Sequence, residues 1–384
     1  MPGRALAVVV VALAGIGFVA FHWSDSYQWK PDSLFYEAQL LRVQGTPKSE
    51  ALRKVFNGPL AAPRVSEELR DTPPARRTVA SPSWVAYSSR FYERRWLVPA
   101  LGAAIEPVLG DDALRAVSLA GYVLTGLLVY FLLALRFRIW IAAVVSLGVL
   151  ALGPLRYWSL LPLTDSFGVA LEAAALATAV LALRRPRPWL AVFALTMLAL
   201  SFTRDATVVV VAGLAWVALR ERSHRAAVTL ATGIVASLPA PLLFGAPTRE
   251  IMAYTLNQFR PPAHATWSFI RSRYVDGEKG LAKDDLTYLV HHPYVGLFAV
   301  GGIAALYAIR TAEDEAGSLL RGAVVGAIAL LLVAPNFTGL RLELPFVPLA
   351  AFGVALGLDA IRRRAPGSPV PVPRRWLARR GGGT

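Results

Sequence analysis

The stretch ALRAVSLAGYVLTGLLVYFLLAL, Ala113 to Leu135, decides the fold class of this sequence. It is long enough to cross a bilayer as a helix, which takes about 20 mostly apolar residues. Similar runs recur along the chain of 384 residues, of which 55% are hydrophobic and only 17% charged. Because soluble proteins carry about 25% charged residues, the composition predicts an all-α polytopic membrane protein.

The apolar runs are numerous enough to predict about ten transmembrane helices in a single membrane domain, residues 1–361. The first run, behind Arg4, lacks a small-residue cleavage site and is read as a retained signal anchor. Trp96–Leu109 is apolar but short, and its prolines favour an interfacial or re-entrant helix. The predicted spans are Ala5–Phe21, Ala113–Leu135, Ile139–Gly153, Phe167–Leu183, Trp189–Phe202, Ala206–Leu219, Ala226–Phe244, Tyr294–Ile309, Gly322–Ala334 and Pro345–Ile361.

The positive charges orient these spans. The net charge is +15, and arginines gather in RFR, RRPRP, RERSHR and the basic, Pro-rich tail at residues 362–384. Such loop charge is typical of the cytoplasmic side of a membrane rather than of nucleic-acid binding. Both termini are therefore expected in the cytoplasm, and the tail is expected to be disordered. Two long loops, residues 22–112 and 245–293, are expected outside the membrane and to carry interfacial helices.

Two aspartates follow the first span within the first outer loop. Asp32 begins DSLFYEAQLLRVQG, whose spacing predicts an amphipathic interfacial helix that starts with Asp32 or Ser33 as its N-cap and ends at Gly45. Asp32 is then either a functional carboxylate or only a helix cap. Asp25 lies directly after the span, and solvation at the interface explains it equally simply.

Charged pairs also occur at the outer ends of later segments. Arg94 and Arg95 open the apolar segment RRWLVPAL. They suit either phosphate recognition or anchoring at the interface. Arg204 and Asp205 occupy a short turn between two spans. Either the two side chains form a salt bridge with each other, or the turn holds Arg204 toward an anionic ligand.

Three further ionisable residues lie at the same predicted membrane face. Asp165, in LPLTDSFGVAL, either caps its own helix or lines a cavity, and Arg341 and Glu343 precede the last span. Charged groups at membrane depth are costly and usually face a partner or a polar cavity. We therefore expect a shared cavity at the outer face.

Several kinds of chemistry lack their sequence signatures. The chain has no cysteine, no Walker-type loop, no HExxH, no GxSxG and no dinucleotide fingerprint. His291 and His292 are adjacent and His264 stands alone, so no metal site is predicted. Asp284–Asp285 is expected to open a short amphipathic segment that ends at Pro293. The sequence assigns no cofactor and leaves a divalent cation as an open alternative.

The segment DSLFYEAQLLRVQG resembles a recurrent feature of the C-type superfamily of integral-membrane glycosyltransferases, in which an acidic residue in the first outer loop precedes Y…A…L…G. RRWLVPAL, LPLTDSFGVAL, SFTRDATVVV and GLRLELPFVPL look like later blocks of bacterial members, in the same order. The similarity is architectural over most of the chain, and each motif is short and degenerate. Many members carry two adjacent acidic residues, whereas Ser33 follows Asp32 here.

This resemblance implies an inverting, mannosyltransferase-like glycosyltransferase that uses a polyprenyl-phosphate sugar at the outer face of a bacterial cytoplasmic membrane. Its acceptor would be a glycan, a lipid or a protein. Asp32 would be the general base, and Asp25 a second catalytic carboxylate. The arginines would stabilise the departing phosphate. The implied phosphate contacts are Arg204, Arg341, Arg94 and Arg95, and the implied cavity residues are Tyr36, Asp165, Asp205 and Glu343.

Two other functions stay open on the sequence alone. A transporter or flippase of a lipid-linked or anionic substrate would place ionisable residues near the bilayer midplane. The predicted spans are nearly free of charge there, with Glu172 as the main exception. A non-catalytic membrane protein of envelope assembly is the third alternative.

Overall fold

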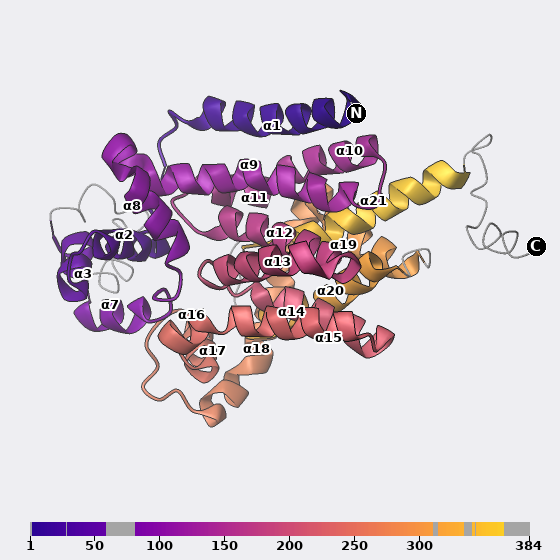
Figure 1. Ribbon diagram of the computed structural model, residues 1–384. Helices are drawn as coiled ribbons and strands as arrows, with labels where there is room; N and C mark the ends of the chain where they lie inside the picture. Colours follow the sequence, from indigo (N-terminus) through magenta and orange to yellow (C-terminus); the bar gives the residue numbers. More distant parts are fainter. Residues whose placement is uncertain are drawn as a thin grey trace, which may run out of the picture.

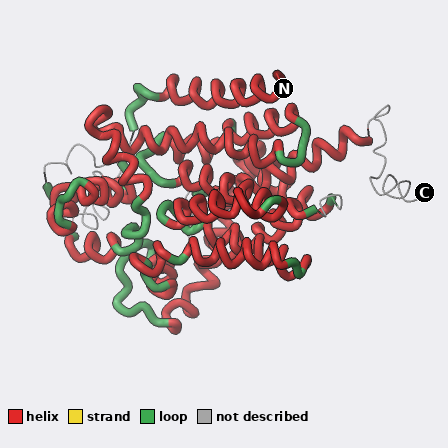
Figure 2. Tube along the Cα trace, viewed as in Figure 1, coloured by secondary structure: helices red, strands yellow, loops and turns green. Residues whose placement is uncertain are grey.

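The protein is entirely helical in the part that its computed structural model describes, residues 2–27, 29–58, 81–309, 314–333, 340–341 and 343–364 (Figure 2). This confirms the predicted all-α class. Residues 365–384, most of the predicted disordered tail, lie outside the described residues, as do residues 59–80 of the first long loop.

The longer helices lie roughly side by side and form a bundle (Figure 1). The helices of the first half are α1 (Pro2–His22), α2 (Pro31–Val43), α3 (Lys48–Phe56), α7 (Pro82–Ser89), α8 (Leu97–Leu109), η1 (Gly110–Asp112), α9 (Ala113–Ala134), α10 (Ile139–Leu150), α11 (Gly153–Ser159) and α12 (Asp165–Arg184). Those of the second half are α13 (Pro186–Ser201), α14 (Thr207–Glu221), α15 (His224–Ser237), α16 (Pro239–Phe244), α17 (Thr248–Leu256), α18 (Trp267–His291), α19 (Pro293–Ala308), α20 (Glu315–Val333), η2 (Leu344–Phe346) and α21 (Val347–Arg364).

Six helical segments among the described residues are long and apolar enough to cross a membrane, or up to eight if each of two bent helix pairs forms one span. The bent pairs are α10 with α11, at 61°, and α18 with α19, at 114°. The chain is thus a multi-pass membrane protein by the length and composition of its helices. The predicted number of ten stays a prediction, and α13 is one predicted span that is shorter than a full crossing in the described residues. Trp96–Leu109, predicted as a separate interfacial helix, forms α8 and runs into α9 through the single turn η1.

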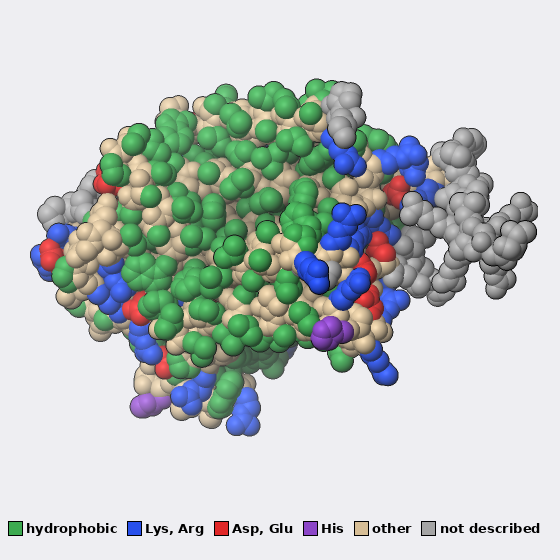
Figure 3. Space-filling model, viewed as in Figure 1, with side chains coloured by type: hydrophobic (Ala, Val, Ile, Leu, Met, Phe, Trp, Pro, Cys, Tyr) green, Lys and Arg blue, Asp and Glu red, His purple; other side chains and the backbone are tan. Residues whose placement is uncertain are grey.

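The arginine-rich connections meet at one end of the bundle. Arg136 lies 2.8 Å from Asp314, and Arg184 lies 3.6 Å from Glu315. The start of α1 and the end of α21 lie at this end as well (Figure 1). The space-filling view shows hydrophobic side chains over the middle of the bundle and charged ones gathered toward its ends (Figure 3). This distribution is expected of helices that cross an apolar layer.

The opposite end carries α2, α3, α7 and α8, which have a hydrophobic core of their own against the start of α9. Ser33–Leu40 of α2 are all buried, so the predicted amphipathic helix is instead enclosed on all sides. The reason is that α3 and α8 cover the face expected to meet solvent. The predicted end of this helix is confirmed: α2 ends at Val43, and Gly45 has a φ of +96°, which favours glycine.

Arg115 is the one charged residue of the stretch Ala113–Leu135, and it links α9 to the end of α1. Its guanidinium donates to the carbonyl oxygens of His22, at 2.7 Å, and Trp23, at 2.9 Å, and lies over the ring of Tyr27. It therefore satisfies backbone acceptors where α1 ends. Its side chain is only 2% exposed, and these partners explain how a charge is buried there.

The second long loop departs from its prediction. Asp284 and Asp285 do not open a helix but lie within α18, a continuous helix of 25 residues. Thr266 is the N-cap of α18, and its side chain accepts a hydrogen bond from the backbone of Phe269. The helix therefore starts well before the aspartates. The sequence predicted a helix start at Asp284 because aspartate is common at helix N-termini.

Candidate functional site

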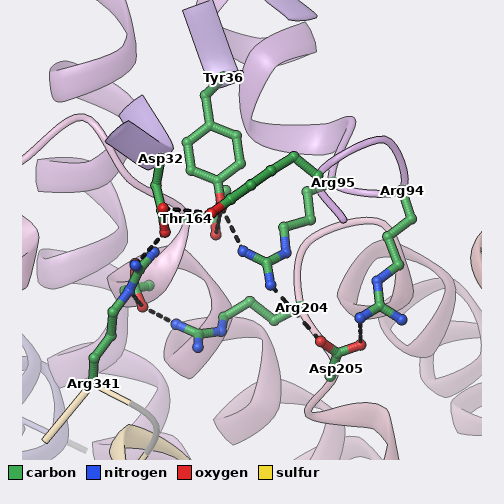
Figure 4. Close-up of polar contacts among 10 residues, drawn as sticks. Asp32, Tyr36, Arg94, Arg95, Thr164, Arg204, Asp205 and Arg341 are labelled. Carbon is green, nitrogen blue, oxygen red and sulfur yellow. Dashed lines mark hydrogen bonds and ion pairs between the residues drawn. The ribbon is translucent and has the colours of Figure 1, made fainter. Parts of the chain in front are cut away.

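Five segments that are distant in sequence bring charged side chains together (Figure 4). They are the first turn of α2, the loop before α8, the first turn of α12, the turn between α13 and α14, and the segment before η2. We call their seven charged residues the arginine–aspartate cluster. Its members are Asp32, Arg94, Arg95, Asp165, Arg204, Asp205 and Arg341.

Asp32 is held by two donors. The Tyr92 hydroxyl donates to its Oδ1, and Nη1 of Arg341 donates to its Oδ2. The alternative that Asp32 only caps α2 is wrong, because the helix starts at Pro31 after Lys30 and has no side-chain cap. The carboxylate points instead toward Tyr92 and Arg341, which belong to other segments of the chain.

Asp165 lies at the first residue of α12 and is fully buried. Its Oδ1 accepts hydrogen bonds from Nη1 of Arg204 and from Nε of Arg341, the latter at 2.8 Å. The capping interpretation is therefore wrong, because Asp165 is not the N-cap and its carboxylate bonds to side chains of other segments. The cavity-lining alternative stays a prediction. A carboxylate buried this completely needs charged partners, and two arginines supply them.

Arg204 and Asp205 do not pair with each other as their sequence neighbourhood suggested. Arg204 bonds to Asp165, whereas Asp205 bonds to Arg94 and lies 3.8 Å from Arg95. The turn between α13 and α14 directs the two neighbouring side chains to different partners (Figure 4). Their mutual salt bridge is excluded by these contacts, and both residues belong to the cluster.

Tyr36 links Arg95 of the cluster to Thr164. Its buried hydroxyl accepts from Nη1 of Arg95 at 2.7 Å and shares a hydrogen bond with the Thr164 hydroxyl at 3.2 Å (Figure 4). The Arg95 guanidinium thereby lies between Tyr36 and Asp205, and Thr164, Tyr36, Arg95 and Asp205 form one chain of polar contacts.

Two of the expected site residues lie elsewhere. Asp25 is half-exposed and pairs with Nδ1 of His22 at 2.6 Å, at the end of α1. The structure does not bring Asp25 into the cluster, because its partner is the histidine three residues before it. Glu343 lines an apolar cavity beside the cluster, together with Asp285.

This cavity has a volume of about 460 Å³. It lies between α19, α21 and the bends that join α10 to α11 and α18 to α19. Leu340 and Glu343, which flank Arg341 in sequence, both line it. The cavity therefore adjoins the segment that carries Arg341. The rest of its lining is apolar except for Asp285.

The charges of the cluster do not balance, because four arginines face three aspartates. Burial acts to raise the pKa of Asp32, but the charge of Arg341 and the Tyr92 hydrogen bond hold it below its ordinary value. Burial likewise acts to raise the pKa of Asp205, but the charge of Arg94 holds this pKa below its ordinary value. Burial and the charge of Arg341 lower the pKa of Arg204 to about 9, so Arg204 stays charged at pH 7.

The cluster also has unused hydrogen-bonding capacity. Among the described residues, Nη2 of Arg341 and Nε of Arg95 are buried without a hydrogen-bond partner. Buried donors are usually satisfied. Together with the excess positive charge, these donors can receive an anion, and guanidinium groups recognise phosphate oxygens well.

Two residues of this site were missed in the sequence. Tyr92 belongs to FYERRW, two residues before Arg94, and its aromatic character next to an arginine pair was the available signal. The Trp158 ring lies beneath the Arg341 guanidinium, with 5.3 Å from the guanidinium carbon to the ring centroid. It gave no signal because Trp158 was predicted to lie in the loop between the spans Ile139–Gly153 and Phe167–Leu183. No group of three or more His, Cys, Asp or Glu residues within the described ranges could hold a metal ion.

No family model matches this chain, and no curated protein matches it either. The site is therefore interpreted from its own geometry and from the sequence resemblance.

Proposed function

We propose that the protein is an inverting glycosyltransferase that moves a sugar from a polyprenyl-phosphate donor to a hydroxyl of a glycan, lipid or protein acceptor. The observation that carries this proposal is the arginine–aspartate cluster. It combines a carboxylate at its edge with arginine donors that have no hydrogen-bond partner among the described residues. The donor phosphate would bind Arg341 and Arg204, with Arg94 and Arg95 completing the positive field.

The chemistry follows from these groups. The acceptor oxygen attacks the anomeric carbon while Asp32 takes the hydroxyl proton. The bond between the anomeric carbon and the phosphate oxygen breaks, and its electron pair leaves with the prenyl phosphate. The arginines stabilise the charge that develops on that oxygen. A single displacement of this kind inverts the anomeric configuration.

A membrane location suits such a donor. The apolar cavity beside Arg341 offers space for part of a prenyl chain while the phosphate lies at the cluster. We place the cluster at the outer face of a bacterial cytoplasmic membrane, with both termini in the cytoplasm, because the arginine-rich connections lie at the opposite end of the bundle. The full complement of about ten spans, as in the C-type superfamily, belongs to this proposal.

The test uses purified protein in micelles with a polyprenyl-phosphate sugar and a panel of acceptors. We expect Asp32→Asn to lower turnover by about 10²–10⁴-fold. Asp25→Asn should retain turnover, because Asp25 pairs with His22 outside the cluster. Full activity of a well-folded Asp32→Asn protein would remove Asp32 from the role of base.

One observation favours transport as a second candidate function. Glu172 lies within α12, is fully buried, and neither of its carboxyl oxygens has a hydrogen-bond partner among the described residues. Ionisable groups inside spans often mark transport pathways. Flux of a lipid-linked sugar in proteoliposomes, lost in Glu172→Gln and unaccompanied by glycosyl transfer, would favour the transporter.

A further inference from the structure

Both oxygens of Asp32 are occupied by donors in this structure, Oδ1 by Tyr92 and Oδ2 by Arg341. A carboxylate whose charge is stabilised in this way is a weak base. An acceptor hydroxyl also needs access to one of these oxygens. If Asp32 acts as the base, one of its two donors has to give way.

Arg341 is the donor that can leave. Its Nε is held separately by Asp165 at 2.8 Å, and its guanidinium lies over the Trp158 ring. Its Nη2 has no hydrogen-bond partner among the described residues. A phosphate can therefore bind Nη1 and Nη2 through two oxygens, while the side chain stays anchored on Asp165.

Tyr92 is fixed in place by its surroundings. Its ring stacks on Phe35 at 4.5 Å and meets Tyr36 edge-on at 5.7 Å. The Gln39 side chain donates to its backbone carbonyl. Burial and the charge of Asp32 raise the pKa of Tyr92 well above its ordinary value, so its hydroxyl keeps the proton that it donates.

We propose that an anionic ligand draws Arg341 away from Oδ2 of Asp32. The Tyr92 hydroxyl keeps its hydrogen bond to Oδ1 and orients the carboxylate for proton transfer. Tyr92 is thus a positioning residue, and the donor phosphate itself frees the base. This inference rests on the proposed function for its catalytic meaning.

The proposal predicts how ligand binding changes the titration of Asp32. The charged and titratable groups that face Asp32 are Arg341, Arg95, Tyr92 and Tyr254. A bound phosphate offsets the positive charge of Arg341 and adds a negative charge nearby. Both changes favour the protonated carboxyl, so the pKa of Asp32 rises toward the range in which a general base is effective.

The first test is an infrared titration of the carboxylate stretching bands in micelles, with the Asp32 band identified by its absence in Asp32→Asn. Geranylgeranyl phosphate is the probe. We expect the probe to raise the titration midpoint of Asp32 by about one pH unit or more, and this response should be lost in Arg341→Gln. An unchanged or lower midpoint in the wild-type protein would overturn the proposal.

The second test separates positioning from folding. Tyr92→Phe keeps the ring and its stacking but removes the hydroxyl. We expect kcat to fall about tenfold with little change in the donor KM. The acid limb of the pH profile should move to higher pH, because the carboxylate loses a stabilising hydrogen bond. The control is Tyr122→Phe, whose buried hydroxyl donates to the Leu150 carbonyl outside the cluster.

A changed donor KM alone, or an unmoved pH profile, would contradict the role of Tyr92. The infrared titration needs no turnover. It can therefore contradict the release of Asp32 from Arg341 independently of the proposed glycosyltransferase function. A ligand-dependent midpoint in a protein that transfers no sugar would contradict only the proposed function. A fixed midpoint in an active transferase would contradict only the release of Asp32 from Arg341.

Discussion

The most deeply buried charges of the arginine–aspartate cluster meet partners from other segments of the chain. Asp165 is the clearest case, because it is fully buried and faces two arginines. Asp32 shares one of these arginines but lies at the edge of the cluster. The two carboxylates should therefore respond differently to substitution.

We expect Asp165→Asn to destabilise the protein by about 3–5 kcal/mol, because it leaves Arg204 buried without its carboxylate partner. Asp32→Asn should destabilise it less, since Arg341 keeps Asp165. Thermal denaturation in detergent measures both variants. Equal stability losses would show that burial does not distinguish the two aspartates.

The lowered pKa values of Asp32 and Asp205 define a pH dependence of stability. A carboxyl group whose pKa is lower in the folded than in the unfolded protein stabilises the fold above its unfolded value of about 3.9, and this contribution is lost as the pH falls through the folded value. We expect the stability difference between wild type and Asp32→Asn to be constant near neutral pH and to shrink below about pH 4. A difference that grows on acidification would contradict the ion pair.

At the scale of elements, close helix packing depends on small residues. Gly353 of α21 lies so near Gly302 of α19 that a Cβ at position 353 would overlap the Gly302 carbonyl oxygen. Small residues that let backbones approach closely are typical of helix pairs in membranes. Gly357, one turn later on α21, has open space around its Cα.

This pair of glycines provides a matched test. Gly353→Ala should destabilise the protein by about 1–3 kcal/mol through overpacking, whereas Gly357→Ala should be close to neutral. Both variants add one methyl group to the same helix, so differences in helix propensity cancel. Similar denaturation midpoints for the two variants would refute the close approach of α19 and α21.

At the scale of the whole molecule, the apolar cavity lies next to the charged cluster. A methylene group is about as large as a water molecule, which fills about 30 Å³ in the liquid, so the cavity of about 460 Å³ has room for about 15 carbon atoms. Such a volume holds only the first part of a long prenyl chain. The remainder would lie in the lipid.

This size sets an expected dependence on donor chain length. The donor KM should fall at least about tenfold for each isoprene unit added up to about three, and little beyond that, because each buried methylene contributes about 0.8 kcal/mol. Ala304→Phe, which narrows the cavity, should move this limit to shorter chains. Ala308→Phe, on the same helix outside the cavity lining, is the control. A KM that keeps falling with longer chains would contradict the cavity as the chain site.

The sequence by itself determined the helical membrane class, the end of α2 at Gly45 and which arginine-rich connections share one end of the bundle. These features depend on local properties, namely the length of apolar runs, the backbone freedom of glycine and the charge between spans. The sequence also singled out all seven residues of the cluster as candidate site residues, with a helix cap as the alternative for Asp32 and Asp165.

Only the tertiary structure decided which charges meet. Arg204 pairs with Asp165, far away in sequence, rather than with its neighbour Asp205, and Asp25 is left with His22. Tertiary packing also buries most of α2 and brings the Tyr92 hydroxyl into a hydrogen bond with Asp32. The physical reason is that a buried charge takes the partner that helix packing brings within reach, and packing is set by side chains across the whole bundle rather than by spacing along the chain.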